Sequence, residues 1–208
     1  MKTRRVLLLT FVAFVAFASS GCGYNTLTTK QQNVRRSGAD VESQLQRRAD
    51  LVPNLVAAAQ SAGIQEQEVF GQIAEARSKL LNATGAQGQG EGGDKTPEQR
   101  QAVIDAANSF GGTIGRLLSL QESYPQLRSV EAFMNVQTAL EGTENRIGVS
   151  RQDYNAAVQD YNTSRNSFPQ VIAAKMYGFK EEPYFKAEEG ARQAPQIDPN
   201  VMRRNQNK

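Results

Sequence analysis

The sequence predicts an all-α protein: an elongated antiparallel four-helix bundle over residues 26–185, followed by a disordered C-terminal tail at 186–208. Three observations support this prediction. Apolar residues recur at helical spacing through most of the chain, one segment keeps a regular seven-residue repeat over 39 residues, and the clearest breaks are rich in Gly or Pro.

Residues 1–21 are predicted to be a lipoprotein-type signal peptide outside the fold. Basic residues at positions 2–5 precede the apolar run 6–18, and small residues follow it. The 13 residues of this run would span about 20 Å as a helix, less than the roughly 30 Å of hydrocarbon in a bilayer. We therefore expect a secretion signal rather than a membrane span.

The single cysteine, Cys22, follows this signal directly, and a lone cysteine cannot form an internal disulfide. The segment SSGCG resembles a bacterial lipobox, in which the cysteine carries diacylglycerol and an N-acyl chain, although Ser19 stands where Leu is usual. We expect lipid attachment at Cys22, with residues 22–25 as anchor and linker on the extracytoplasmic face of an inner or outer membrane. A signal anchor or plain secretion is the alternative.

Composition excludes several classes of function. Without the signal the chain has 21 basic and 21 acidic residues, so no positive field would attract nucleic acid. The absence of His excludes a Ser–His triad, a Cys–His pair and a His-rich zinc site. Paired carboxylates such as Glu66 and Glu75 remain, but acidic residues on helices usually form a solvated face. We expect no enzyme activity, no metal and no cofactor beyond the covalent lipid.

The first helix is expected over residues 26–49 and the second over 51–81. Pro53 interrupts the apolar pattern, because proline lacks an N–H and its ring clashes with the preceding turn. If Asp50 is the N-cap, Pro53 becomes the third residue of a new helix, where an N–H has no intrahelical partner. One long helix kinked at Pro53 is the alternative. Both interpretations place a break or sharp bend at this proline.

The third helix is predicted to follow a flexible, glycine-rich loop at residues 82–95. Thr96 is expected at the N-cap, Pro97 at the first helical position and Gln99 at the third, which together form a capping box. Glycines inside a helix are costly, so we expect close approach of a neighbouring helix backbone there. These glycines are Gly111, Gly112 and Gly115.

The fourth helix has the strongest pattern in the chain. Large apolar residues recur every seven positions, and a second set lies three positions before each of them. The first set is Phe133, Leu140, Ile147, Tyr154, Tyr161 and Phe168. The second set includes four polar residues, named here the polar seam: Gln137, Glu144, Arg151 and Arg165. We favour pairing of these side chains with facing segments to fix register, with a ligand site as the alternative.

The segment after this helix contains a second candidate site. Pro169 is expected to end the long helix, residues 171–177 to form a short one, and Gly178 to terminate it. Beyond it lie three large residues in a polar stretch, Phe179, Tyr184 and Phe185. We favour their folding back to cap the bundle, with an exposed docking patch as the alternative. The tail at 186–208 has little apolar content, which is typical of disorder.

Several motifs resemble the LemA family in order, from about Gly23 to Phe185. They are RRADLVPNLV, IAEARSKL, ESYPQL, LEGTENRIGVSRQDYN and YNTSRNSFPQVIAAKMYGFKEEPYF. The resemblance implies a membrane-tethered, extracytoplasmic helical bundle, associated with membrane-bound complexes and without an established enzymatic activity. Gly38 stands where family members commonly have Trp, so the first helix is expected to pack more loosely.

The leading functional hypothesis is a membrane-anchored scaffold or interaction protein of the bacterial cell envelope, with a protein partner or self-association. The alternative is a binding module for a small molecule or envelope polymer, using the seam around Glu144 and Arg151. A pocket of roughly several hundred Å³ flanked by these two side chains would favour the binding module, and a tightly packed core would favour the scaffold.

Overall fold

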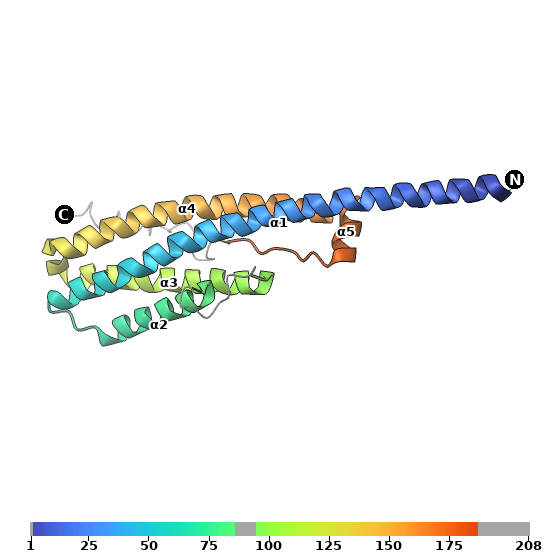
Figure 1. The fold of residues 1–208 in the computed structure, drawn as a ribbon. Coiled ribbons are helices and arrows are strands. Elements are labelled where there is room, and N and C mark those ends of the chain that lie inside the picture. The colour runs from blue at the N-terminus through green and yellow to red at the C-terminus, as the bar shows by residue number, and fades with distance from the viewer. Residues whose placement is uncertain (1, 86–94, 187–208) are drawn as a thin grey trace, which may run out of the picture.

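The computed structural model describes the backbone of residues 2–85 and 95–186, and the side chains within these ranges from Gly23 onward. All regular elements in this part are helices, which confirms the all-α prediction (Figure 1). They are α1 (Lys2–Ser61), α2 (Gln67–Thr84), α3 (Pro97–Ser123), the 3₁₀ helix η1 (Pro125–Ser129), α4 (Glu131–Asn166) and α5 (Gln170–Tyr177). The predicted tail, apart from Lys186, lies outside the described residues.

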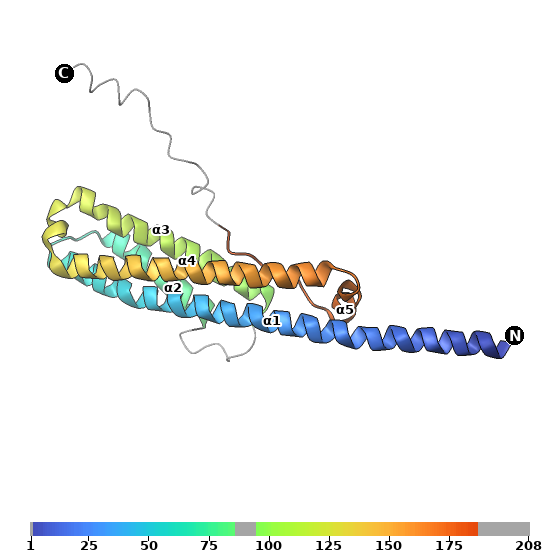
Figure 2. The ribbon, with the colours of Figure 1, turned by 90° about the horizontal axis from the view of Figure 1, so that it is seen from above.

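The body is elongated, and two long helices form its axis. Figures 1 and 2 show α1 and α4 side by side, with the shorter α2 and α3 paired next to them. The chain follows α1 away from the N-terminus, turns into α2 and α3, and returns along α4. Helix α5 packs on α1 and α4 at the end of the body from which the N-terminal part of α1 projects.

The seven-residue pattern predicts the core of α4 well except at its end. Phe133, Leu140, Ile147, Tyr154 and Tyr161 are all buried. Phe168, the last position of the pattern, is 81% exposed, and α4 ends two residues before it. The physical reason is Pro169, because the residue before a proline is pushed out of the helical region.

The prediction of a new helix capped by Asp50 is wrong, since α1 runs without interruption through Pro53, and the alternative of one long helix is correct in this respect. Proline leaves the carbonyl of Ala49, four residues earlier, without its helical donor. Arg77 of α2 fills this vacancy, because its Nε donates to the Ala49 carbonyl at 2.8 Å. Its guanidinium also lies 3.4 Å from the carboxylate of Asp50. Because of Pro53, the Ala49 carbonyl of the continuous α1 is available to bind Arg77 of α2.

The turn between α1 and α2 lies instead at residues 62–66. Gly63 has a left-handed backbone with φ of 81°, and its N–H donates to the Gln60 carbonyl. Ile64 donates to the Ala59 carbonyl and is itself buried. These two hydrogen bonds, with the buried Ile64 after the glycine, form a Schellman motif, which ends α1.

The start of α3 confirms the predicted capping box. The Thr96 hydroxyl accepts from the N–H of Gln99, and the Gln99 side chain accepts from the N–H of Thr96. The role expected for the three glycines of α3 is wrong, since they do not meet a neighbouring backbone. A Cβ placed on Gly111 would lie 3.5 Å from Nη2 of Arg48, and Gly112 and Gly115 border open space.

The short helix after α4 and its end at Gly178 agree with the prediction. Helix α5 spans Gln170–Tyr177, and Gly178 ends it with a φ of 73°. Among the residues whose side chains the structure describes, no helix has an apolar stretch long enough to span a bilayer. The apolar run 6–18 lies outside those residues.

Candidate interaction site on α4 and the C-terminal strap

Residues 179–186, named the strap here, form an extended segment that runs from α5 back toward the start of α3 (Figure 1). An extended segment without a neighbouring strand needs other partners for its backbone groups. Here α4 supplies them, because a row of its side chains hydrogen-bonds to the strap backbone. The row consists of Tyr154, Asn155, Tyr161, Asn162 and Arg165.

The two asparagines each bind one strap residue through both backbone groups. Asn155 donates to the carbonyl of Phe185 and accepts from its N–H, both at 2.9 Å. Asn162 does the same with Glu182, at 2.9 and 3.0 Å. Seven helical residues rise about 10.5 Å and three extended residues about 10 Å, so the spacing of the asparagines on α4 matches that of their partners.

The tyrosines beside these asparagines repeat the same register. The Tyr154 hydroxyl donates to the Pro183 carbonyl at 2.9 Å, and the Tyr161 hydroxyl donates to the Lys180 carbonyl at 2.8 Å. Burial, and then the charge of Glu182, raises the pKa of Tyr161 to about 12 and that of Tyr154 above its usual range. Both phenols therefore stay protonated as hydrogen-bond donors.

Two ion pairs tie the strap to α3. Glu182, whose side chain is fully buried, lies 2.9 Å from Nε of Arg100. Burial raises the pKa of Glu182, while the charge of Arg100 opposes this rise. Lys180 bonds to Glu98 at 2.9 Å on the surface, and this bond, together with hydrogen bonds from the backbone N–H of Glu98 and from the side chain of Thr96, lowers the pKa of Glu98 to about 2. The strap thus joins the first turn of α3 to α4.

Comparison with known proteins shows the family to which the chain belongs. The family model described as LemA family matches residues 37–198, which cover most of the chain and the whole of α4, α5 and the strap. The chain belongs to the LemA family. Two proteins of Paramagnetospirillum magneticum (strain ATCC 700264 / AMB-1), magnetosome proteins MamQ 1 and MamQ 2, are each 29% identical to it over 95% of this chain and 76% of their own length.

A third relative has a similar degree of identity. Magnetosome protein MamQ of Magnetospirillum gryphiswaldense (strain DSM 6361 / JCM 21280 / NBRC 15271 / MSR-1) is 26% identical over 95% of this chain and 77% of its own length. The alignments with these relatives, like the match to the family model, extend over most of this chain.

Two residues of the polar seam join α4 to different helices. Gln137 accepts from Nε2 of Gln121 in α3 at 2.6 Å. Glu144 is half exposed and lies 3.0 Å from Nη1 of Arg48, a buried residue of α1. Burial lowers the pKa of Arg48, and the charge of Glu144 opposes this.

The other two seam residues contact the strap. The guanidinium of Arg151 lies 5.2 Å from the centre of the Phe185 ring, and Nε of Arg165 donates to the Phe179 carbonyl at 2.8 Å. The four residues of the polar seam therefore have separate partners, and the structure does not gather them into one site.

Two hollows of the described surface lie away from Glu144 and Arg151. One of about 370 Å³ lies between α2 and α3, and its lining includes Glu75, Lys79 and Arg116. Another of about 280 Å³ lies between α1 and α2. Neither is lined by Glu144 or Arg151, so no observation at these hollows favours a ligand site at the seam.

The three residues of the candidate docking patch are half-buried against the core. Phe185 packs edge-on against the Tyr154 ring at 5.3 Å, and Phe179 lies 5.7 Å from Tyr24. Tyr184 also packs on the core. Around Gly38, Tyr154 and Phe185 leave a hollow of only about 10 Å³, so the looser packing expected there is small. Cys22 lies within α1, but its side chain is outside the described residues.

The sequence analysis named Tyr154, Tyr161 and Arg165 but missed the other residues that hold the strap. Asn155, Asn162, Arg100 and Glu182 stood outside the apolar pattern and were not singled out. One signal was present, because QDYN occurs at 152–155 and again at 159–162. A polar residue repeated at seven-residue spacing beside a core tyrosine indicates a second, polar contact along the same helix.

Proposed function

We propose that this LemA-family protein is a membrane-anchored scaffold of the bacterial cell envelope. It would be an elongated antiparallel four-helix rod on the extracytoplasmic face, tethered through lipid on Cys22. The observation that supports this most is α1, which contains Cys22 and continues from there as one helix along the axis of the body. Residues 23–61 of this helix rise about 58 Å, so a tether at its root would hold a stiff body outward.

The relatives and the site support a structural rather than a catalytic role. The MamQ relatives are named as proteins of the magnetosome, which favours a component of a larger assembly. The titratable groups with shifted pKa values at the strap bond to other groups of the same chain. We therefore propose no catalytic step and no cofactor beyond the covalent lipid.

A protein partner would fit the hollow of about 280 Å³ between α1 and α2. Its lining includes Pro53, Val56 and Phe70, which are apolar and at least partly exposed. It lies toward the end of α1 opposite the anchor, where a partner can approach without meeting the membrane. An apolar side chain from a partner helix is the kind of group that this hollow would take.

The anchor is tested by Cys22→Ala, with Ser20→Ala as the matched control. We expect the Cys22→Ala protein to lose incorporation of a labelled palmitate analogue and to move from the membrane fraction to the soluble fraction. The Ser20→Ala protein should keep both properties. Complete retention of the Cys22→Ala protein in membranes, with unchanged labelling, would show that Cys22 is not the lipid site.

The scaffold role is tested by crosslinking in intact cells. A photo-reactive amino acid replaces Ala57, an exposed residue that lines the hollow, and in a control replaces the exposed Asn145 of α4. We expect a discrete crosslinked product from position 57 and a weaker, diffuse pattern from position 145. The same pattern from both positions would count against a specific partner at this hollow.

A further inference from the structure

Helix α5 presents its large apolar residues to solvent and its small residues to the body. Ala173 and Ala174 are buried, whereas Ile172, Met176 and Tyr177 are 55%, 59% and 54% exposed. A surface helix of a soluble protein normally has the opposite orientation, with its large apolar side chains toward the core. The outward face of α5 therefore needs an explanation beyond folding.

Close packing against α1 explains why only small residues face inward. A Cβ placed on Gly23 of α1 would lie 3.4 Å from the Cβ of Ala173. At this separation the two helices leave no room for a branched or aromatic side chain, and the larger residues of α5 must point away. Phe168, in the turn that precedes α5, is also exposed, at 81%.

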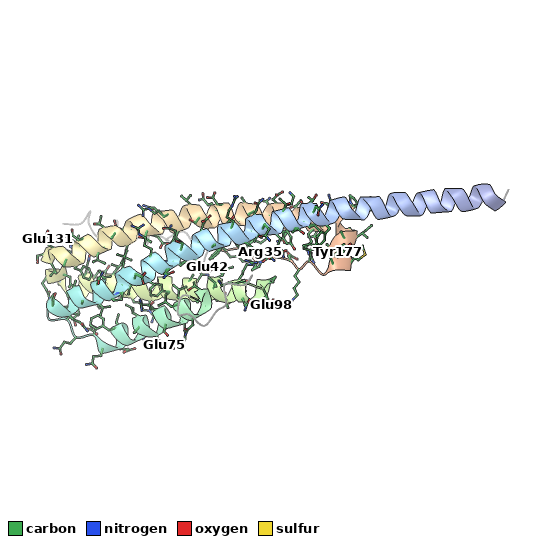
Figure 3. The ribbon with its side chains drawn as sticks, in the orientation of Figure 1. Arg35, Glu42, Glu75, Glu98, Glu131 and Tyr177 are labelled. Carbon is green, nitrogen blue, oxygen red and sulfur yellow. The ribbon has the colours of Figure 1, made fainter. Side chains whose placement is uncertain are left out.

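These exposed residues belong to α5 and the turn before it, which lie at the end of the body where the projecting part of α1 begins. Figures 1 and 2 place α5 at the end of the body where this part leaves it, and Figure 3 places Tyr177 at that end and Glu131 at the opposite one. Tyr24 of α1 is 41% exposed, and its ring centre lies 4.9 Å from that of Tyr177. Tyr24 is two residues from Cys22.

We propose that this surface, formed by Tyr24, Phe168, Ile172, Met176 and Tyr177, inserts into the headgroup region of the lipid bilayer that holds the anchor. The inference rests on the membrane anchoring proposed above. Apolar faces of interfacial helices enter the boundary between headgroups and acyl chains by roughly 5–10 Å, and tyrosines concentrate at the headgroup level. Lys175, exposed on the same helix, suits contact with lipid phosphates.

A bilayer fits this surface better than a protein partner because the chain itself brings the bilayer there. The anchor is either lipid on Cys22 or, if the signal is not cleaved, the apolar segment 6–18. In both cases it enters the membrane from α1, before Tyr24. Either anchor holds the membrane next to α5 at high effective concentration, and a weak apolar contact is then sufficient. The surface would fix the tilt of the rod rather than supply the anchoring itself.

The absence of Trp from the chain allows a direct test on the full-length, lipid-modified protein. Ile172→Trp introduces a single fluorophore into the proposed surface. Val149→Trp is the matched control, because Val149 is 59% exposed on α4, about 26 Å of helix from Asn166. Both variants are reconstituted into phosphatidylcholine vesicles with and without brominated acyl chains, and flotation measures how much protein is membrane-bound.

For the Ile172→Trp protein we expect a blue-shifted emission in vesicles and several-fold stronger quenching by brominated lipid than for the Val149→Trp protein. Flotation of both variants with equal, weak quenching would overturn the membrane-contact surface and leave the anchor standing. Failure of both to float would overturn the anchor and the surface together. A blue shift without bromine quenching would show that a second copy of this chain covers α5 instead, which also overturns the proposal.

Discussion

Helix α5 and the strap are neighbouring parts of one motif, yet their large apolar residues face in opposite directions. Ile172 and Met176 of α5 are exposed, whereas Phe179 and Phe185 of the strap pack on the core. Hydrophobicity alone does not separate the two stretches. The difference shows that the partner surface decides which apolar residues are buried.

The backbone accounts for this difference. Helix α5 makes its regular backbone hydrogen bonds between its own residues and can pack through any side that fits, which at Gly23 is the alanine side. The strap has no internal hydrogen bonds, so it must follow the row of donors and acceptors on α4, and this register turns its aromatic residues inward. The following predictions test this contrast between α5 and the strap, from the largest expected effect to the smallest.

Loss of a tyrosine beneath the strap should have the largest effect. Tyr161 is fully buried, so Tyr161→Ala should lower the free energy of unfolding by about 4 kcal/mol through the cavity and lost apolar contacts. Tyr161→Phe, the matched control, removes only the bond to the Lys180 carbonyl and should cost about 1 kcal/mol. Urea denaturation of both variants measures these values. Equal, small losses would mean that the strap is not held at this point.

Breaking the buried ion pair should have the next largest effect. Glu182→Ala leaves Arg100 without its partner and should cost about 3 kcal/mol. Replacement of both residues, by Arg100→Met with Glu182→Met, should cost much less, because no unpaired charge then remains buried. A double-mutant cycle in urea gives the coupling. Additive effects would contradict a direct pair between α3 and the strap.

The hydrogen bond from Arg77 to the Ala49 carbonyl shows how much a single side-chain to main-chain bond contributes to the free energy of unfolding, for comparison with the bonds of the strap. Arg77→Met should cost about 1 kcal/mol in the natural sequence. In a Pro53→Ala background the cost should fall, since the new N–H at position 53 can supply the Ala49 carbonyl. Thermal unfolding of the four proteins measures this coupling. An unchanged cost in both backgrounds would show that Pro53 does not create the need for Arg77.

Glu98 of α3 and Glu182 of the strap should affect stability in opposite directions as the pH changes. Hydrogen bonding holds the pKa of Glu98 near 2, below the ordinary 4.5, so its contribution is present above pH 4.5 and is lost as the pH falls toward 2. Burial raises the pKa of Glu182, so its contribution grows as the pH falls through its folded pKa toward 4.5. In plots of the free energy of unfolding against pH, measured by urea denaturation, Glu98→Gln and Glu182→Gln should therefore remove the pH dependence from different parts of the range. Identical curves for the two variants would contradict these shifts.

A change on the outward face of α5 should have the smallest effect in solution. Ile172→Ala should alter the free energy of unfolding by less than about 0.5 kcal/mol, because the side chain is mostly exposed. Phe179→Ala in the strap, measured under the same conditions without lipid, should cost several times more. A large loss for Ile172→Ala would mean that α5 packs on the body through this face.

Local signals predicted much of the fold but only part of the site. The capping box at Thr96 and the end of α5 at Gly178 depend on residues a few positions apart, and both predictions are confirmed. The effect of Pro53 depends on Arg77, which lies 24 residues further along the chain, so the local pattern suggested a break that does not occur. The signal that ends α1 was present at Gly63, next to the apolar Ile64.

The sequence by itself determined the helical class, the core stripe of α4, the start of α3 and the end of α5, because helical periodicity and capping act within a few residues. Tertiary structure alone decided which partners the polar seam takes, why α1 continues through Pro53, and which apolar residues of the last motif are buried. These outcomes depend on backbone and side-chain groups that meet only when distant segments pack. Register between the repeated Tyr-Asn pairs and the strap is therefore a property of the folded chain.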